Sequence, residues 1–334
     1  MGGLVERIAG QWSLAGRTTG DQNGGMDEPI IDWLLAGDPA IRWQVRNDLI
    51  DASPNSVGAT RELVATEGWG ARFLAEQDAD DRWGGGLYSP KWISTTYTLL
   101  SLERLGLADS NPAAAAGTRL LVDAGLADHG GVTFWPSRPE GEGCVTGMVL
   151  KLMARFLPDD PARDRIVDHL AARQLPDGGW NCQDVNGATH SSLHTTITVL
   201  EGLAAARRAG SGGCDGLMAN GNEFMFDHHL YRSHTTGEVI SPAMTRFSFP
   251  PRWWFDVLRG LDYLQSVDAE YDERLEDPIA LMRRKRTKGG RWKLQNRHSG
   301  LTYFAMEDVG KPSRMNTLRA LRVERWWERT APGR

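Results

Sequence analysis

The sequence predicts an all-α protein, an (α/α)6 toroid in which six inner and six outer helices form a closed ring. Three observations predict this fold class. Apolar segments with helical spacing alternate with loops rich in Gly and Pro, and almost nothing alternates with the period of two that strands require. Two stretches, 77–105 and 174–203, can be aligned with each other by eye. Helix starts recur about every 50 to 60 residues, which is typical of repeated units that bury their faces against neighbours.

The inner helices are expected to begin near residues 43, 95, 146, 195, 256 and 317. Thr-Thr pairs at 95–96 and 195–196 open two of them, and each pair follows an acidic turn and a Trp. A second, outer helix is expected between successive starts, for example over 112–125 and 161–173. The terminal helix pairs are as apolar as the middle ones, so we expect a closed ring rather than an open solenoid with polar caps.

Composition excludes several classes of protein. Of the 334 residues, 40% are hydrophobic and 24% are charged, which excludes a disordered or fibrous chain. A formal net charge of −5 argues against nucleic acid as a partner. No apolar run reaches the length of a transmembrane segment. The three cysteines are few and odd in number, which predicts a reducing, cytoplasmic compartment rather than a disulfide framework.

The chain is expected to form a single domain over 26–334, preceded by a flexible tail over 1–25. The tail is rich in Gly, Thr and Gln, and it lacks the basic start and apolar core of a signal peptide. The 13 Trp residues are the compositional outlier of the whole chain. Their number predicts either repeated aromatic motifs or a cavity lined with aromatic side chains.

One repeated motif carries a family resemblance. Gln174 precedes an Asp-Gly-Gly-Trp segment that ends at Trp180; 77–83 is a degenerate copy, and 289–292 is a third copy without its Gln. The motif resembles the glutamine–tryptophan repeat of squalene and terpene cyclases. Over residues 27–330 the chain resembles the α/α-toroid superfamily of terpene cyclases and protein prenyltransferase β subunits. The resemblance implies that these Gln and Trp side chains fasten an outer helix to the turn that follows it.

The resemblance also implies an enzyme that acts in a Trp-lined cavity on an isoprenoid or another hydrophobic substrate, including one that bears a diphosphate. Asp80 lies in an Asp-x-Asp-Asp sequence like that of the protonating acid of such cyclases, and Asp256 is a second acid candidate. Asp80 lies inside the turn, however, and not directly before an inner helix, so its register favours a solvated loop. The residues expected to bind substrate are Trp92, Trp135, His234, Arg252, Trp253, Trp254 and Arg314.

A second constellation predicts a zinc site. Glu142 and Cys144 open the third inner helix, Cys182 lies in the next loop, and His194 opens the fourth inner helix. Adjacent inner helices of a closed ring begin on the same rim, so we expect these side chains to converge, with His190 as a further possible ligand. Glu142, Cys144 and His194 resemble zinc ligands of prenyltransferase β subunits, although Glu replaces Asp and the aromatic residue after the Cys is missing. Thiolate, imidazole and carboxylate are ligands that zinc prefers.

Three functions stay open at the level of the sequence. The first is a terpene-cyclase-like enzyme, and the register of Asp80 weighs against it. The second is a zinc-dependent, prenyltransferase-like or thiol-activating toroid, in which Cys144 and His194 serve catalysis and Zn²⁺ is the cofactor. The third is a non-catalytic binding scaffold, in which Cys144 and Cys182 are small buried core residues.

Overall fold

The computed structural model describes residues 28–332, and every regular element within that range is helical. The all-α class is therefore confirmed for this part of the chain. The tail expected over 1–25 lies outside it. None of the helices in this range has the length and apolar character that a membrane crossing needs.

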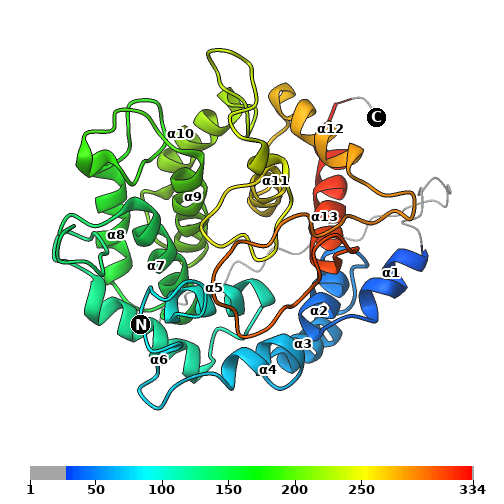
Figure 1. Cartoon of the computed structure of the whole chain (residues 1–334), viewed down its shortest axis with the longest axis horizontal. Coiled ribbons are helices and arrows are strands. Elements are labelled where there is room, and N and C mark those ends of the chain that lie inside the picture. Colours follow the sequence, from blue (N-terminus) through cyan, green and yellow to red (C-terminus); the bar gives the residue numbers. More distant parts are fainter. Residues whose placement is uncertain (1–27, 333–334) are drawn as a thin grey trace, which may run out of the picture.

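Six helices occupy the middle of the molecule, and each begins within a few residues of an expected inner-helix start (Figure 1). Much of their surface is buried; in α9, for example, both Thr195 and Ile197 are buried although they lie on nearly opposite faces of the helix. Helices buried on all sides belong at the centre of a fold. These helices are α2 (Pro39–Asp48), α5 (Thr95–Leu105), α7 (Gly143–Phe156), α9 (Leu193–Arg208), α11 (Val257–Ser266) and α13 (Arg314–Thr330).

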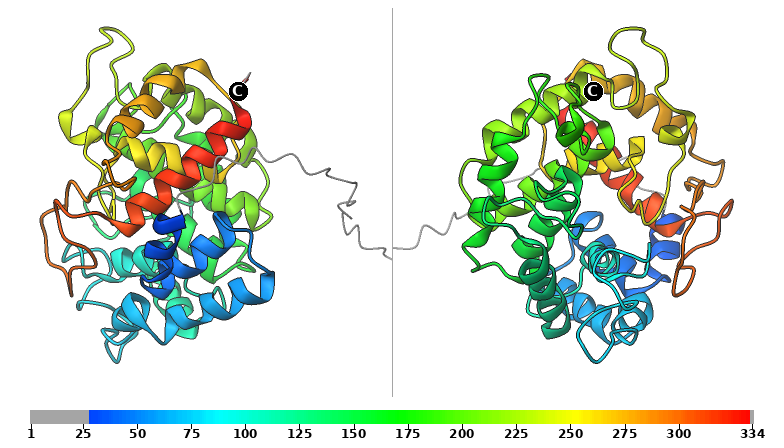
Figure 2. Two further views of the ribbon diagram at one scale, coloured as in Figure 1. Left: turned by 90° about the vertical axis from the view of Figure 1, so that its right-hand side faces the viewer. Right: turned by 60° about the vertical axis from the view of Figure 1, so that its left-hand side comes forward.

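The remaining helices lie around the outside of these six (Figures 1 and 2). The expected outer helices over 112–125 and 161–173 are present as α6 and α8. Asn111 caps α6 by accepting a hydrogen bond from the backbone N–H of Ala114 at 3.1 Å. The outer α-helices are α1 (Glu28–Leu35), α3 (Pro54–Glu62), α4 (Gly68–Leu74), α6 (Pro112–Gly125), α8 (Ala162–Ala172), α10 (Cys214–Asp227) and α12 (Glu276–Arg284), with short 3-10 turns at 63–65, 184–186, 242–245 and 273–275.

The six central helices contact one another in chain order, and the last contacts the first. Helix α7 packs on α5 and α9, α11 packs on α9 and α13, and α13 packs on α2. The circuit from α2 to α5 is made by Trp43, whose indole N–H donates to the carbonyl of Leu105 at 2.8 Å. Helices α7 and α9 approach most closely at Gly147 and Gly202: a Cβ on Gly202 would lie 2.5 Å from the carbonyl oxygen of Gly147.

Three buried Trp residues repeat one hydrogen-bond pattern. The indole N–H of Trp83, Trp180 and Trp292 donates to a carbonyl at the end of the preceding outer helix, at 2.7 to 2.8 Å. The backbone N–H of each Trp donates to a Thr hydroxyl in the first turn of the next central helix. Each Trp thus fastens an outer helix, a turn and a central helix together.

Two Gln residues complete this pattern, and an Arg replaces the third. Gln77 and Gln174 each donate to the carbonyl four residues further on and to a carbonyl of the next outer helix. Arg286 lies six residues before Trp292, where the other two copies have Gln. Its Nε donates to the carbonyl of Gly290, again four residues on, at 3.3 Å. The third copy therefore keeps the hydrogen bond with a different side chain, which is why a search for Gln misses it.

Candidate functional site

Two cysteines meet where α7 begins. Cys144 lies in the first turn of α7, and Cys182 lies in the loop that leads to α9. The sulfur of Cys182 accepts hydrogen bonds from the backbone N–H of Cys144 at 3.3 Å and from the hydroxyl of Thr195 at 3.4 Å. The loop and both helices thus hold one sulfur at the N-terminus of α7, where the helix dipole favours negative charge.

The two sulfurs differ in how readily they carry negative charge. The thiol of Cys144 donates a hydrogen bond to the Cys182 sulfur and, together with the Thr195 hydroxyl, lowers the pKa of Cys182, although burial opposes it. The same hydrogen bond, together with burial, raises the pKa of Cys144. Cys182 is therefore the sulfur that carries negative charge more readily.

Glu142 adds an oxygen to the two sulfurs. Its carboxylate pairs with Arg138 and is mostly buried. Glu142, Cys144 and Cys182 offer ligand atoms that all lie within 4.8 Å of one another. Two sulfurs and one oxygen this close can hold a metal ion. In a tetrahedral zinc site the ligand atoms lie about 3.3 to 3.8 Å apart when each bond is about 2.0 to 2.3 Å, so a pair at the 4.8 Å limit would have to close by about 1 Å on binding. The donor set leaves a fourth position for water or substrate.

His194 does not lie in this group. Its Nδ1 accepts a hydrogen bond from the backbone N–H of Phe255 at 2.8 Å. Its ring lies against Trp253 and Trp254, with centroids 5.4 and 5.2 Å away. The pKa of His194 is lowered to about 4, mainly because the ring is mostly buried and also because Arg259 carries a positive charge nearby. The loop before α11 thus uses a neutral His194 as a hydrogen-bond acceptor, and His190 is exposed.

A cluster of aromatic side chains lies beside the cysteines. The ring of Tyr88 lies 5.1 Å from Tyr97 and 5.0 Å from Trp135, and Trp92 lies 4.7 Å from Tyr97. Burial raises the pKa of Tyr88, and the neighbouring Cys144 raises it further, so the phenol stays protonated. Trp92 and Trp135 were expected here from the sequence, whereas Tyr88 and Tyr97 were missed. Tyr97 follows the Thr-Thr pair directly, and that position was a usable signal.

Arg252 reaches into the same aromatic region without a carboxylate partner. Its guanidinium lies 5.7 Å from the ring centroid of Trp92, and its Nη1 donates to the hydroxyl of Ser101 at 3.3 Å. Burial lowers the pKa of Arg252 to about 10, and no carboxylate among the described residues offsets this effect. The side chain therefore remains a half-buried cation that can pair with an anionic group.

An open groove of about 680 Å³ begins at Tyr88 and continues over the loop before α7. Its lining is largely apolar, and the apolar side chains include Leu87, Tyr88, Phe134, Trp135, Pro136 and Pro139. Tyr88 lines the groove and also neighbours Cys144, so the groove starts beside the cysteine pair.

The two acid candidates have other surroundings. Asp256 is 2% exposed and caps α11, accepting from the backbone N–H of Arg259 at 3.0 Å and from the hydroxyl of Ser248 at 2.6 Å. Asp80 is exposed, and its carboxylate lies 3.6 Å from the guanidinium of Arg82 in the same turn. Asp256 caps α11 because it directly precedes that helix. Asp80 is exposed because it lies in the turn before Trp83.

The remaining substrate-binding candidates are dispersed. Trp253 and Trp254 stack on each other at 4.1 Å near His194. His234 is exposed and pairs with His228 at 3.0 Å. Arg314 begins α13, donates to the carbonyl of Trp33 at 2.9 Å and lies over that ring. The structure gathers Arg252 with Trp92, and it uses Arg314 to hold α1 against α13.

Comparisons with known proteins give few matches. No family model matches the sequence, and no curated protein matches it. A solved structure of a protein from Actinoplanes is similar to this chain, with 17% identity and a TM-score of 0.42 over 87% of this chain and 90% of that one.

Proposed function

We propose that the chain is an (α/α)6 toroid enzyme that binds Zn²⁺ through Glu142, Cys144 and Cys182 and acts on a hydrophobic substrate beside the metal. The ring architecture is supported by the contacts that run from α2 through the central helices to α13 and back to α2. It is also supported by the outer helices that the repeated Trp pattern fastens to this circuit.

The observation that carries the metal function is the spacing of three ligand atoms within 4.8 Å. A pair of sulfurs with one carboxylate oxygen suits zinc better than Mg²⁺ or Ca²⁺, which prefer oxygen alone. Cys182 already holds its sulfur ready for deprotonation, since two donors point at it. Metal binding must then remove the proton of Cys144, which makes zinc affinity depend on pH.

The surrounding residues suit a substrate with an apolar body and an anionic end. The groove that starts at Tyr88 offers an apolar surface for an isoprenoid-like chain. Arg252 offers an unpaired guanidinium for a carboxylate or a diphosphate. A bound zinc ion would supply a Lewis acid that lowers the pKa of a water or thiol at its open position.

A terpene-cyclase-like activity is the second candidate, because Trp92, Tyr97 and Trp135 provide aromatic faces that stabilise carbocations. Its weakness is the acid: Asp80 lies on an exposed turn, and Asp256 is occupied as a helix cap. The metal function uses the residues that lie together, so we favour it.

Zinc analysis of the purified protein tests the proposal. We expect the wild type to bind one Zn²⁺ per chain, and Co²⁺ replacing it to show sulfur-to-cobalt charge-transfer absorption. Cys144→Ala and Cys182→Ala each remove one sulfur ligand, so both should lose the metal after dialysis against a chelator. The wild type should also gain thermal stability with added Zn²⁺. A ligand that binds only the folded state stabilises it by about 2.7 kcal/mol when the free ligand concentration is 100 times the Kd.

Cys214→Ala is the matched control. Cys214 is 1% exposed at the start of α10, and its sulfur lies near the carbonyl of Ser211 rather than near another cysteine. This variant should keep the metal. A wild type without bound zinc, or zinc retained by both Cys144→Ala and Cys182→Ala, would overturn the proposal in favour of the binding scaffold.

A further inference from the structure

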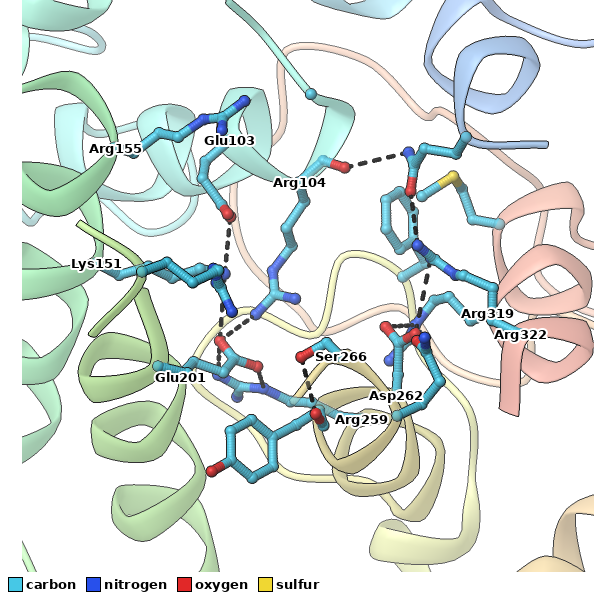
Figure 3. Close-up of a pocket in the computed structure, with 18 of the residues that line it drawn as sticks. Glu103, Arg104, Lys151, Arg155, Glu201, Arg259, Asp262, Ser266, Arg319 and Arg322 are labelled. Carbon is cyan, nitrogen blue, oxygen red and sulfur yellow. Dashed lines mark hydrogen bonds and ion pairs between the residues drawn. The ribbon is translucent and has the colours of Figure 1, made fainter. Parts of the chain in front are cut away.

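A cavity of about 250 Å³ lies inside the circuit of central helices, and each of those helices contributes to its wall (Figure 3). Figure 3 shows Arg104 extending from α5 toward Glu201, with Lys151 and Arg259 directed at the same carboxylate. One wall residue from each helix, in chain order, is Gln44, Arg104, Lys151, Glu201, Arg259 and Arg319.

The wall carries a surplus of positive charge, although the whole protein has a net charge of −5. Its acidic residues are Glu103, Glu201 and Asp262. Its basic residues are Arg104, Lys151, Arg155, Arg208, Arg259, Arg319 and Arg322, so cations exceed carboxylates by four.

The carboxylate of Glu201 is already saturated. Arg259 binds it with two hydrogen bonds, at 2.8 and 3.1 Å, and Arg104 adds a third at 2.7 Å. The ammonium of Lys151 lies 3.5 Å away. Burial alone would raise the pKa of Glu201, but the charges of Arg104, Arg259 and Lys151 hold it well below its usual range. Glu201 therefore has no capacity to neutralise further cations.

The other two carboxylates of the wall are paired as well, and Glu103 lies 2.7 Å from the ammonium of Lys151. Asp262 lies 3.0 Å from Arg319 and 3.7 Å from Arg322. Outside the wall, Asp48 pairs with Arg322, and Asp109 pairs with Arg155. Even when these two outer carboxylates are counted, the cations of the wall exceed the carboxylates by two.

Three of these cations have a buried donor without an acceptor in the described part of the chain. Arg319 is 2% exposed, and its Nη2 is a buried nitrogen with no hydrogen-bond partner among the described residues. The Nε atoms of Arg155 and Arg322 are unpartnered as well. A buried donor left unsatisfied costs about 1 to 3 kcal/mol. An acceptor placed in the cavity would remove this cost and offset the surplus charge at the same time.

We propose that this cavity binds a small oxyanion, either inorganic phosphate or the phosphate group of a monoester. Guanidinium groups from different helices face one space, and a tetrahedral oxyanion can accept from several of them at once, whereas a carboxylate has only two oxygens. The cavity holds the volume of roughly eight water molecules at ~30 Å³ each, which is enough for phosphate and a short organic group.

This site is separate from the proposed zinc centre. Lys151 follows Cys144 by seven residues on α7, a rise of about 10 Å along the helix. No wall residue of the cavity belongs to the group formed by Glu142, Cys144 and Cys182. Phosphate binding therefore does not depend on the metal, and Cys144→Ala should bind phosphate as the wild type does.

Calorimetric titration at constant ionic strength tests the proposal, with inorganic phosphate, glycerol phosphate and malonate as three probes. The wild type should bind at least one of the two phosphates more tightly than malonate. Tighter binding of glycerol phosphate would identify a monoester as the ligand, and tighter binding of inorganic phosphate would identify the free ion. Arg319→Gln and Arg322→Gln remove cavity cations, and each should weaken phosphate binding at least tenfold.

Arg329→Gln is the control, because Arg329 is 60% exposed and pairs with Asp268 on the outside of α13. It should bind phosphate unchanged. If Arg319→Gln does not fold, Arg322→Gln decides, since its side chain is 16% exposed and also contacts the cavity. No phosphate binding by the wild type up to about 10 mM, tighter binding of malonate, or unchanged affinity in a folded Arg322→Gln would each overturn the proposal.

Discussion

Two regions of the molecule differ in chemistry, although helices α5, α7 and α9 contribute to both. One is the region around Cys144 and Cys182 at the start of α7, and the other is the cavity inside the circuit of central helices. Near the start of α7, Tyr88 neighbours Cys144, and a chain of aromatic rings runs from Tyr88 through Tyr97 to Trp92, which lies beside Arg252. Further along the same helices, the wall of the cavity holds ten charged side chains, which are those named above. The first region is organised by ring packing and hydrogen bonds to sulfur, and the second by shared carboxylates.

Helix α7 shows the physical reason for this division. Its first turn holds Cys144, and its last turn holds Arg155. The partial positive charge of a helix N-terminus favours a thiolate, and the partial negative charge of its C-terminus favours cations. Along α7, therefore, the end near the cysteines favours negative charge, and the end near Arg155 favours cations. The comparison teaches that one helix can pass through two regions of opposite charge preference.

The largest effect should come from removing the shared carboxylate of the cavity. Glu201→Ala leaves Arg104, Lys151 and Arg259 buried with fewer partners, and such uncompensated charge costs about 3 to 5 kcal/mol. We expect this loss in the free energy of unfolding, measured by urea denaturation. Excess phosphate should recover part of it, because the anion would face the same cations.

Glu67→Ala is the control for that loss. Glu67 pairs with Arg42 at 3.2 Å, but its side chain is 53% exposed, so the change should stay within about 0.5 kcal/mol. An equal, small effect for Glu201→Ala would show that the cavity charges are solvated, and the contrast between the two regions would then fail.

A smaller effect should appear at the aromatic end as a pH dependence. The pKa of His194 is lowered to about 4 in the folded chain, against about 6.5 when unfolded. Below pH 6.5 the unfolded state binds a proton that the folded state refuses, so stability is full above pH 6.5 and falls as the pH decreases toward 4. We expect this group to contribute a loss of about 2 kcal/mol over that range, after allowance for its partial exposure.

His194→Asn isolates this contribution, since Asn offers an oxygen to the backbone N–H of Phe255 but does not titrate. Denaturation curves at pH 7 and at pH 4.5 should therefore differ less in the variant than in the wild type. The same pH dependence in both proteins would assign the loss to other groups.

The sequence predicted the helices and the cysteine pair well, because both follow from local signals. The recurring helix-start signals placed all six central-helix starts within four residues of those observed, and Pro112 marked the start of α6. Cys144 and Cys182 could be brought together because each lies beside the start of a central helix. His194 shares that position in the chain, yet its ring is directed at the loop before α11.

The cavity could not be predicted in the same way. Lys151, Glu201, Arg259 and Arg319 each interrupt an apolar helical run, and that was a usable sign of interior charge. Each of them, however, pairs with a residue that lies 48 to 97 positions away in the sequence. A periodic pattern does not show which cation meets which carboxylate. For example, Arg104 meets Glu201 across 97 residues. Pairing at that range depends on the closure of the helix circuit.

The smallest effect should come from the exposed turn that lies outside both regions. Asp80 accepts from the backbone N–H of Arg82 at 3.3 Å, and its side chain is 59% exposed. Asp80→Asn keeps the size and an acceptor oxygen, so the free energy of unfolding should change by less than about 0.5 kcal/mol. Any turnover of an isoprenoid substrate should stay within about tenfold, which corresponds to ~1.4 kcal/mol in the barrier. Complete loss of turnover in a folded Asp80→Asn would identify this carboxyl as the protonating acid, and the reaction centre would then lie at the turn before Trp83 rather than at the cysteines.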